Sequence, residues 1–387
     1  MRSNRRFRSF QFALILALLG LIGCSSAKDP AQAAAPDQAI AGTAAANNIL
    51  PWEADWNKMI AAAKQEGEVA LSGPPGEGWR KALMSFEQDF PGIRVQYTGS
   101  NSRDFWPRLQ RERELGQYLW DLRVGGPDPQ VFEARDKGVL DPIRPLLLLP
   151  EVADESKWVG GFKGLFVDKE QKYVAGFLAF LSSVILVNRD VVPETEFRSD
   201  EDLLDPRWKG KIVLQDPRGG SGLGSITILL AVHGESFVRD LLSRQHLVVT
   251  SDVRQQAEWV VRGRYPIGIG VLPDQLLILK EQGLKFNVQR LKQGAVGLSA
   301  GFGGIQFFNR APHPNAARVY INWLLQRQSQ MRLTQVLETN SRRVDVPVGD
   351  LESAVDPNRI EAYIPHQFET MLPVRQRALE LAMKLLQ

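Results

Sequence analysis

Apolar residues in the first third of the chain alternate between a helical and a strand-like spacing. Trp52, Trp56 and Ile60 recur about one helical turn apart, and Gly67 follows as a typical helix end. Short apolar runs, bounded by Gly, Pro or polar loops, then alternate with further helical patterns. This alternation with short connections indicates an α/β fold, a sheet covered by helices. The runs that we predict as strands are residues 68–72, 93–97 and 121–124.

The middle of the chain has apolar strands that fit a crossover between two such units. Residues 173–177 and 183–188 lie close together in the sequence, and a Gly-rich apolar stretch returns at 295–308. A second strand–loop–helix pattern begins at Trp208. Because the body exceeds the size at which one core keeps growing, we expect two lobes. Their predicted bounds are 51–176 plus 300–387 for lobe 1 and 177–299 for lobe 2.

The N-terminus has the parts of an exported lipoprotein. Four arginines precede an apolar run at 12–22, which is shorter than the roughly 20 residues that cross a bilayer and suits a signal peptide. The run ends in Leu-Ile-Gly-Cys24, which resembles the bacterial lipobox. We therefore predict a signal peptide at 1–23 and lipidation of Cys24, for example with palmitate; a plain signal peptide that happens to hold a cysteine is the alternative. Residues 24–50, rich in Ala and without an aromatic residue, are expected to form a flexible tether.

Charge argues against nucleic acid as a partner. The whole chain has 47 basic and 44 acidic residues, a net charge of +3. Removal of residues 1–23 takes away four arginines and no acid, which leaves 43 basic and 44 acidic residues and a net charge of −1. A mature protein of that charge lacks the excess of Lys and Arg with which proteins bind phosphate backbones.

Polar loops after predicted strands are the candidate ligand contacts of the first lobe. Ser72 and Gly73 end the first strand, and Ser100 and Asn101 precede a helix whose backbone N–H groups favour anions. Gly126 follows the third strand, where a glycine allows close approach of the backbone to a ligand. A helix N-cap at Ser100 or Asn101, and a plain turn at Gly126, are the structural alternatives.

The loop 216–222 is the main candidate contact of the second lobe. It ends a strand, opens a helix and presents Arg218, Gly220 and Ser221. Free N–H groups beside an arginine are typical of an anion site. The loop has neither the Walker pattern nor the nucleophile-elbow pattern. An exposed Arg218 on a structural turn is the alternative.

Three further residues are weaker candidates. Tyr173 lies at the first crossover and Tyr265 precedes a strand, so that either could flank a cleft or pack in a core. Asp274 follows the end of a strand and either pairs with a cationic ligand or caps the next helix.

Several ordered segments resemble family 1 of the bacterial extracellular solute-binding proteins, whose two-lobed class includes periplasmic ferric-iron binders. The resemblance covers nearly the whole body and implies a type 2 periplasmic-binding-protein-like fold. In that fold each lobe is a mixed sheet flanked by helices, and crossover hinge strands join the lobes. The segments include Phe86-Glu87-Gln88-Asp89-Phe90-Pro91-Gly92-Ile93, Asp205-Pro206-Arg207-Trp208-Lys209-Gly210-Lys211 and Gly263-Arg264-Tyr265-Pro266-Ile267-Gly268.

The resemblance implies the solute-binding component of an ABC importer rather than an enzyme. Such a protein captures a small solute in the cleft between its lobes by domain closure and delivers it to a membrane permease and its ATPase. With the lipobox, it implies a monomer that is lipid-anchored on the periplasmic side of the cell envelope. The loop at Arg218 favours an anionic solute such as a carboxylate or phosphonate, and polyamine, thiamine-like and sugar ligands stay open as alternatives.

Two other readings stay open at this point. Ferric iron is an alternative ligand, although the family's ferric binders usually carry adjacent tyrosines and this chain has six tyrosines without a Tyr-Tyr pair. Its four histidines also lack metal-ligand spacing, so we predict no metal site or cofactor. A two-lobed sensory lipoprotein that is not coupled to transport is the second alternative, because fold does not fix function.

Overall fold

The first of two larger sheets has six strands and is built mainly from the N-terminal part of the chain. The computed structural model describes residues 50–386; the predicted signal peptide, Cys24 and tether residues 24–49 lie outside them. The strand order is β2-β1-β3-β13-β4, with β5 also paired to β13. Parallel pairing joins β1 to β2 and β3, whereas β13 runs antiparallel to β3, β4 and β5. The strands are β1 (Glu68–Gly73), β2 (Arg94–Gly99), β3 (Leu122–Gly125), β4 (Leu140–Asp141), β5 (Val174–Gly176) and β13 (Gly304–Phe308).

Helices cover this sheet through apolar faces that the sequence pattern indicates. The largest packing cluster includes Phe86, Tyr320 and Trp323, and the ring centroids of Phe86 lie 4.8 Å from Tyr320 and 5.2 Å from Trp323. Burial of such large aromatic side chains is the main favourable term that holds the lobe together. The helices are α1 (Pro51–Glu66), α2 (Glu77–Met84), α3 (Phe86–Asp89), α4 (Ser102–Glu114), α5 (Pro129–Asp136), α6 (Pro150–Ala153), α7 (Gly161–Leu165), α11 (Pro314–Leu325) and α12 (Arg327–Leu337).

The second large sheet has its own core. Its strand order is β11-β7-β10-β8-β9, in which β8 is parallel to β9 and β10, and β7 is antiparallel to β10 and β11. Buried residues of β7, β8 and β10 pack against α8 in one cluster. The elements are β7 (Ile185–Asn188), β8 (Ile212–Gln215), β9 (Val248–Thr250), β10 (Ile267–Ile269), β11 (Val288–Arg290), α8 (Gly220–Arg244), α9 (Val253–Val261) and α10 (Pro273–Glu281).

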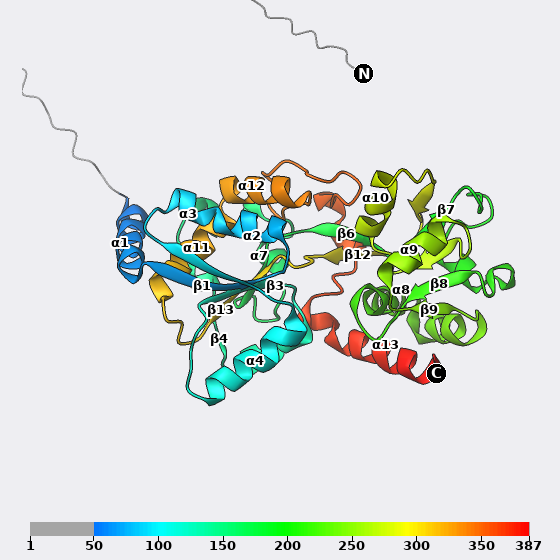
Figure 1. Cartoon of the computed structure of the whole chain (residues 1–387), viewed down its shortest axis with the longest axis horizontal. Helices are drawn as coiled ribbons and strands as arrows, with labels where there is room; N and C mark the ends of the chain where they lie inside the picture. The colour runs from blue at the N-terminus through cyan, green and yellow to red at the C-terminus, as the bar shows by residue number, and fades with distance from the viewer. Residues whose placement is uncertain (1–49, 387) are drawn as a thin grey trace, which may run out of the picture. The chain divides into compact units, whose positions relative to one another are not determined.

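A two-stranded antiparallel sheet connects the two large ones. It pairs β6 (Phe180–Ser183) with β12 (Val296–Ser299). In the sequence β6 lies between β5 and β7, and β12 lies between β11 and β13, so two crossings of the chain pass through this sheet. Figure 1 shows β6 and β12 side by side between the elements of the two large sheets. We call this pair of strands the hinge sheet.

The C-terminal helix α13 (Leu372–Leu385) packs against α8. Ala378 and Leu381 of α13 are buried in the core of the second sheet, and Figure 1 shows the two helices next to each other. The sequence pattern had led us to group residues 300–387 with the first lobe. That division stays a prediction. In the structure α13 packs beside α8 of the second sheet.

One helix among residues 50–386, α8, is long and apolar enough to cross a membrane. Half of its most apolar window is buried inside the protein. Gly234 interrupts it with φ of 80° and ψ of 178°. These features are those of a core helix.

Candidate functional site

A buried arginine lies at the ends of the first-lobe strands. Arg123 on β3 is 2% exposed, and its guanidinium donates to Ser72 Oγ at 2.9 Å and to Ser102 Oγ at 3.1 Å. Its Cζ lies 4.4 Å from the ring centroid of Phe105 on α4. Burial lowers the pKa of Arg123 to about 10, so the side chain stays protonated at neutral pH. Arg123 forms no salt bridge within the described part of the chain, and buried charges are normally paired.

Two predicted serine contacts belong to this arrangement. Ser72, at the end of β1, is fully buried, and its Oγ lies 2.9 Å from Ser100 Oγ. The pairing of β1 with both neighbours brings the two loops and Arg123 together, because β1, β2 and β3 are parallel and end at one edge. The sequence placed Ser72 and Ser100 at this edge but missed Arg123, a charged residue inside an otherwise apolar strand.

A second arginine and one acid extend the charged region. Asp128 caps α5 by accepting from Val131 N at 3.1 Å, and its Oδ2 is buried without a hydrogen-bond partner among the described residues. Burial lowers the pKa of Arg375 on α13. The negative charge of Asp128 acts against this effect, because it raises the pKa of both Arg375 and Arg123. Neither arginine has a carboxylate oxygen within 4.0 Å in residues 50–386. We call these three residues the Arg123–Asp128–Arg375 group; it has two cations and one anion.

Arg375 also acts on a buried histidine beside α8. Burial, followed by the charge of Arg375, lowers the pKa of His366 to about 4. A Cβ built on Gly224 of α8 would lie 3.5 Å from His366 Cδ2, and one on Gly297 of β12 would lie 2.7 Å from Nδ1. His366 therefore fills the space between α8 and the hinge sheet as a neutral side chain.

In the predicted anion loop of the second lobe, residues 216–222, the arginine forms an ion pair with the aspartate of the same loop. Arg218 Nη2 lies 2.5 Å from Asp216 Oδ2, and Arg218 Nε lies 2.8 Å from Oδ1 of the same carboxylate. The ion pair is largely exposed on the Arg218 side. The positive charge of Arg218 is thus already balanced within its own loop, which weakens its case as an anion contact; its role in ligand binding stays a prediction.

The first turn of α8 is more rigidly built than a plain loop. Gly220 opens the helix with φ of 55°, and Ser221 Oγ donates to Gly270 O at 2.6 Å, which fixes the turn against the end of β10. A Cβ on Gly222 would lie 2.1 Å from Gln215 O, so only glycine fits there. The backbone N–H groups at the start of α8 carry the partial positive charge of a helix N-terminus.

Two predicted contacts have structural roles in this fold. Asn101 is the N-cap of α4, accepting from Asp104 N at 3.0 Å, as the alternative interpretation proposed. Gly126 comes so close to the hinge that a Cβ there would lie 2.7 Å from Gly301 O. The cap and the close packing account for these residue types without a ligand, and ligand contact at either position stays a prediction.

The remaining predicted contacts lie among packing residues or at the surface. A Cβ on Gly73 would lie 2.5 Å from Tyr97 Cε2, so this glycine makes room for a ring. Tyr173 packs at the edge of the cluster around Phe105, and Tyr265 makes an edge contact with Trp259 at 5.3 Å. Asp274 is an exposed residue in the first turn of α10, whose N-cap is Leu272, so it is not the helix cap that we considered.

A pocket of about 280 Å³ lies beside Ser100. Its lining combines the loop after β1, the end of β2 with the loop after it, and the first two turns of α4, and of the serines described above it includes Ser100. The lining residues are Pro75, Thr98, Gly99, Ser100, Asn101, Asp104, Phe105 and Arg108.

Neither a scan of protein-family models nor a search of curated proteins by sequence gave a match. Solved structures do match. Iron-bound HitA from Pseudomonas aeruginosa aligns with a TM-score of 0.61 and 17% identity over 82% of this chain and 99% of its own. The apo ferric ion-binding protein A of Pasteurella haemolytica gives a TM-score of 0.63 and 15% identity over 82% and 98%. The periplasmic binding protein P5PA gives 0.58 and 19% over 83% and 100%.

The chain has the fold of the two-lobed periplasmic binding proteins. The fold predicted from the sequence, with mixed sheets flanked by helices, is therefore confirmed. In this periplasmic-binding-protein fold the hinge sheet is the connection that the β5–β7 and β11–β13 crossings share. At these identities the similarity establishes the fold, and the solute has to be argued from this chain's own residues.

Proposed function

We propose that this protein is the solute-binding component of an ABC importer, of the extracellular solute-binding family 1 type, and that it binds a small anionic solute between its lobes. The fold supports a binding protein, because the similar structures are binding proteins and not enzymes. We further propose the lipid anchor at Cys24, the location on the periplasmic side, the monomeric state and the partnership with a permease and its ATPase.

The Arg123–Asp128–Arg375 group carries the proposal of an anion. A buried guanidinium without a paired carboxylate is unfavourable unless another negative group offsets it. Asp128 is an acid whose charge raises the pKa of both buried Arg123 on β3 and half-buried Arg375 on α13. A bound anion supplies the missing charge, and because it contacts groups attached to both lobes it also favours domain closure.

Ferric iron is the second candidate, since several similar structures are described as ferric-binding proteins. Within residues 50–386 no group of three or more His, Cys, Asp or Glu side chains is placed to hold a metal ion. Two of the six tyrosine hydroxyls have other partners: Tyr320 Oη donates to Leu83 O in the core, and Tyr118 Oη accepts from Arg310. These contacts favour the anionic solute over iron held by a tyrosine-rich site.

Native mass spectrometry of the full-length protein, purified in mild detergent and compared with its denatured mass, tests this function. We expect a retained small organic anion. An adduct of iron alone would contradict the proposal and support the ferric candidate. A sensor kinase gene beside the coding gene, in place of permease and ATPase genes, would instead favour the sensory alternative.

A further inference from the structure

Among the described residues, the hydroxyl proton of Ser72 has one available acceptor, Ser100 Oγ. A guanidinium has donors and no acceptor, so Ser72 Oγ must be the acceptor in its 2.9 Å contact with Arg123 Nη1. Ser72 is fully buried, and within the described residues the other partner of its hydroxyl is Ser100 Oγ at 2.9 Å. A buried hydroxyl proton without an acceptor costs about 1–3 kcal/mol. Ser72 therefore donates to Ser100.

This direction leaves Ser100 as a donor toward the outside. Its oxygen accepts from Ser72, so its own proton is free, and Ser100 is only partly buried, beside the pocket after β2. The chain of hydrogen bonds runs from the cation Arg123 through Ser72 to Ser100, and each bond polarises the next. This chain of hydrogen bonds thus ends in the O–H group of Ser100, which has no acceptor among the described residues.

A parallel branch reaches the start of α4. Ser102 Oγ accepts from Arg123 Nη2 at 3.1 Å, which frees the Ser102 proton in the same way. The backbone N–H groups of Ser102 and Arg103 occupy the first two positions of this 13-residue helix and have no acceptor inside it. The neighbouring N–H of Asp104 is already taken by the Asn101 cap. Four donors therefore lie within residues 100–103, the hydroxyls of Ser100 and Ser102 and the N–H groups of Ser102 and Arg103. Arg123, which is 98% buried and whose Nε has no hydrogen-bond partner among the described residues, bonds to this segment through Ser72 and Ser102.

We propose that Arg123 is a positioning residue that makes Ser100 and Ser102 obligatory donors, and that these hydroxyls bind a phosphoryl or phosphonyl oxyanion of the solute. The free hydroxyls of Ser100 and Ser102 and the free N–H groups beside them call for an acceptor in the solute. A tetrahedral oxyanion offers three terminal oxygens to four donors, whereas a carboxylate offers two. The inference rests on the proposed function and specifies the chemical class of its solute.

Two charged side chains, Asp104 and Arg108, line the pocket beside Ser100. Asp104 lines the same pocket, and its Oδ2 accepts from Asn101 Nδ2 at 2.8 Å. Arg108 lines it as well and is paired with Glu112 at 2.6 Å. Asp104 is the acid that opposes a bound oxyanion, and Asp104→Asn removes its charge while keeping an acceptor for Asn101.

Isothermal titration calorimetry of the full-length protein with inorganic phosphate, methylphosphonate and acetate measures whether the site prefers a tetrahedral oxyanion to a carboxylate. We expect phosphate or methylphosphonate to bind at least tenfold more tightly than acetate. Ser100→Ala and Ser102→Ala should each weaken that binding about tenfold, the value of a hydrogen bond to a charged group. Asp104→Asn should strengthen it about threefold through lost repulsion, a gain that damage to the fold does not produce.

Arg342 provides the matched control for Arg123. It is also a fully buried arginine, its guanidinium donates to the carbonyl oxygens of Leu178 and Gly164, and burial lowers its pKa to about 10. Arg123→Met should abolish the preference for phosphate, whereas Arg342→Met should destabilise the protein and leave that preference unchanged.

Three results would overturn the inference. They are equal loss of preference in the Arg342 and Arg123 variants, unchanged phosphate affinity in both serine variants, and tighter binding of acetate than of phosphate. If the wild-type protein binds none of the three probes, the oxyanion site is also wrong. The proposed function survives those outcomes if native mass spectrometry still finds a different retained anion, and fails with them if it finds none.

Discussion

At the scale of single residues, the arginines divide into those with and those without a carboxylate. Arg218, Arg343 and Arg377 are ion-paired and add little net charge to their surroundings. Arg123 and Arg375 are not paired, and burial lowers the pKa of both. This difference in pairing follows from the tertiary contacts and makes Arg123 and Arg375 candidate ligand groups.

Arg375→Ala is expected to weaken binding of the anionic solute about tenfold, because one of two uncompensated cations near Asp128 is lost. Arg377, two residues further along α13 and paired with Glu235 and Glu380, is the matched control. Arg377→Ala should leave the affinity within about twofold in isothermal titration. Equal effects of the two substitutions would refute a specific role for Arg375.

His366 makes stability depend on pH. Its pKa is lowered from 6.5 to about 4 in the folded protein, so between these values the unfolded chain binds more protons than the folded one. Stability from neutral His366 is present above pH 6.5 and is lost as the pH falls toward 4, by up to about 3 kcal/mol.

Urea unfolding at pH 7 and pH 5 measures this loss. His366→Gln should reduce the difference in unfolding free energy between the two pH values, whereas the same change at His246, which is exposed, should not. An identical pH dependence for wild type and the His366 variant would show that this residue titrates normally.

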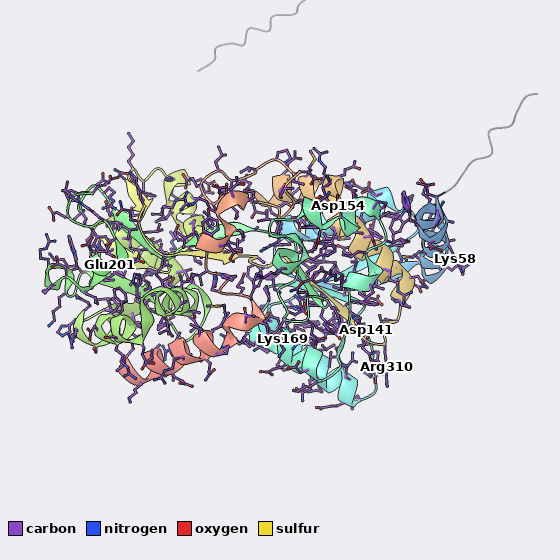
Figure 2. The ribbon with its side chains drawn as sticks, turned by 180° about the vertical axis from the view of Figure 1, so that it is seen from behind. Lys58, Asp141, Asp154, Lys169, Glu201 and Arg310 are labelled. Atoms are coloured by element: carbon purple, nitrogen blue, oxygen red, sulfur yellow. The ribbon has the colours of Figure 1, made fainter. Side chains whose placement is uncertain are left out.

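At the scale of elements, two local arrangements fix the helices around the site. The start of α8 is set by Gly222, which lies against the carbonyl of Gln215, and by the bond from Ser221 to Gly270. The start of α13 is set by Glu369, whose Oε1 lies 2.8 Å from Arg135 Nη2 of α5. Figure 2 labels Lys169, whose Nζ is 3.1 Å from the same carboxylate oxygen.

Gly222→Ala should destabilise the protein by about 1–3 kcal/mol, because the added Cβ would lie 2.1 Å from Gln215 O and must push β8 and α8 apart. Gly219 is the control, since it has extended backbone and no heavy atom within 4 Å of an added Cβ. Thermal unfolding of the two variants compares them. Similar melting temperatures for both would contradict the tight packing at Gly222.

Glu369→Gln should cost about 3 kcal/mol of unfolding free energy, since it leaves buried Arg135 without its buried counter-charge. Glu380→Gln on the exposed face of α13 should cost less than about 1 kcal/mol. Unfolding in guanidinium chloride measures the free energy of unfolding of both variants. A loss at Glu369 no larger than that at Glu380 would indicate that Asp136 alone balances Arg135.

At the scale of the whole molecule, the hinge sheet and the contacts beside it connect the lobes. Gln367 Oε1 accepts from Ser299 Oγ and from Ala300 N, so the segment that leads to α13 is bound to the end of β12. Motion of the lobes about β6 and β12 would change the separation of Arg123 on β3 and Arg375 on α13. A solute that contacts Arg375 and the serines bonded to Arg123 thus favours the closed form.

Small-angle X-ray scattering tests this closure. Addition of the solute found by native mass spectrometry should lower the radius of gyration of the wild-type protein and leave that of the Arg375→Ala variant less changed at equal concentration. An unchanged radius at saturating solute would argue that binding occurs without closure.

The pattern of the sequence predicted much of the architecture because it is local. Helix N-caps, the Gly67 helix end and short apolar strands depend on neighbouring residues, and the resemblance of ordered segments placed two lobes around hinge strands. The predicted strand at 183–188 is nevertheless divided between β6 and β7, with Val184 between them in neither strand. Which sheet a strand joins depends on its partners, and those lie far away in the sequence.

The sequence by itself determined the type of fold and the strand ends at which Ser72 and Ser100 lie. Only the tertiary structure decided that buried Arg123 bonds to Ser72 without a salt bridge to an acid of the described residues, that Arg218 is neutralised by Asp216, and that the charge of Asp128 raises the pKa of both Arg123 and Arg375. The physical reason is that the charge state and hydrogen-bond direction of a buried group depend on which partners surround it. Those partners come from β1, β3, α4, α5 and α13, which are adjacent only after folding.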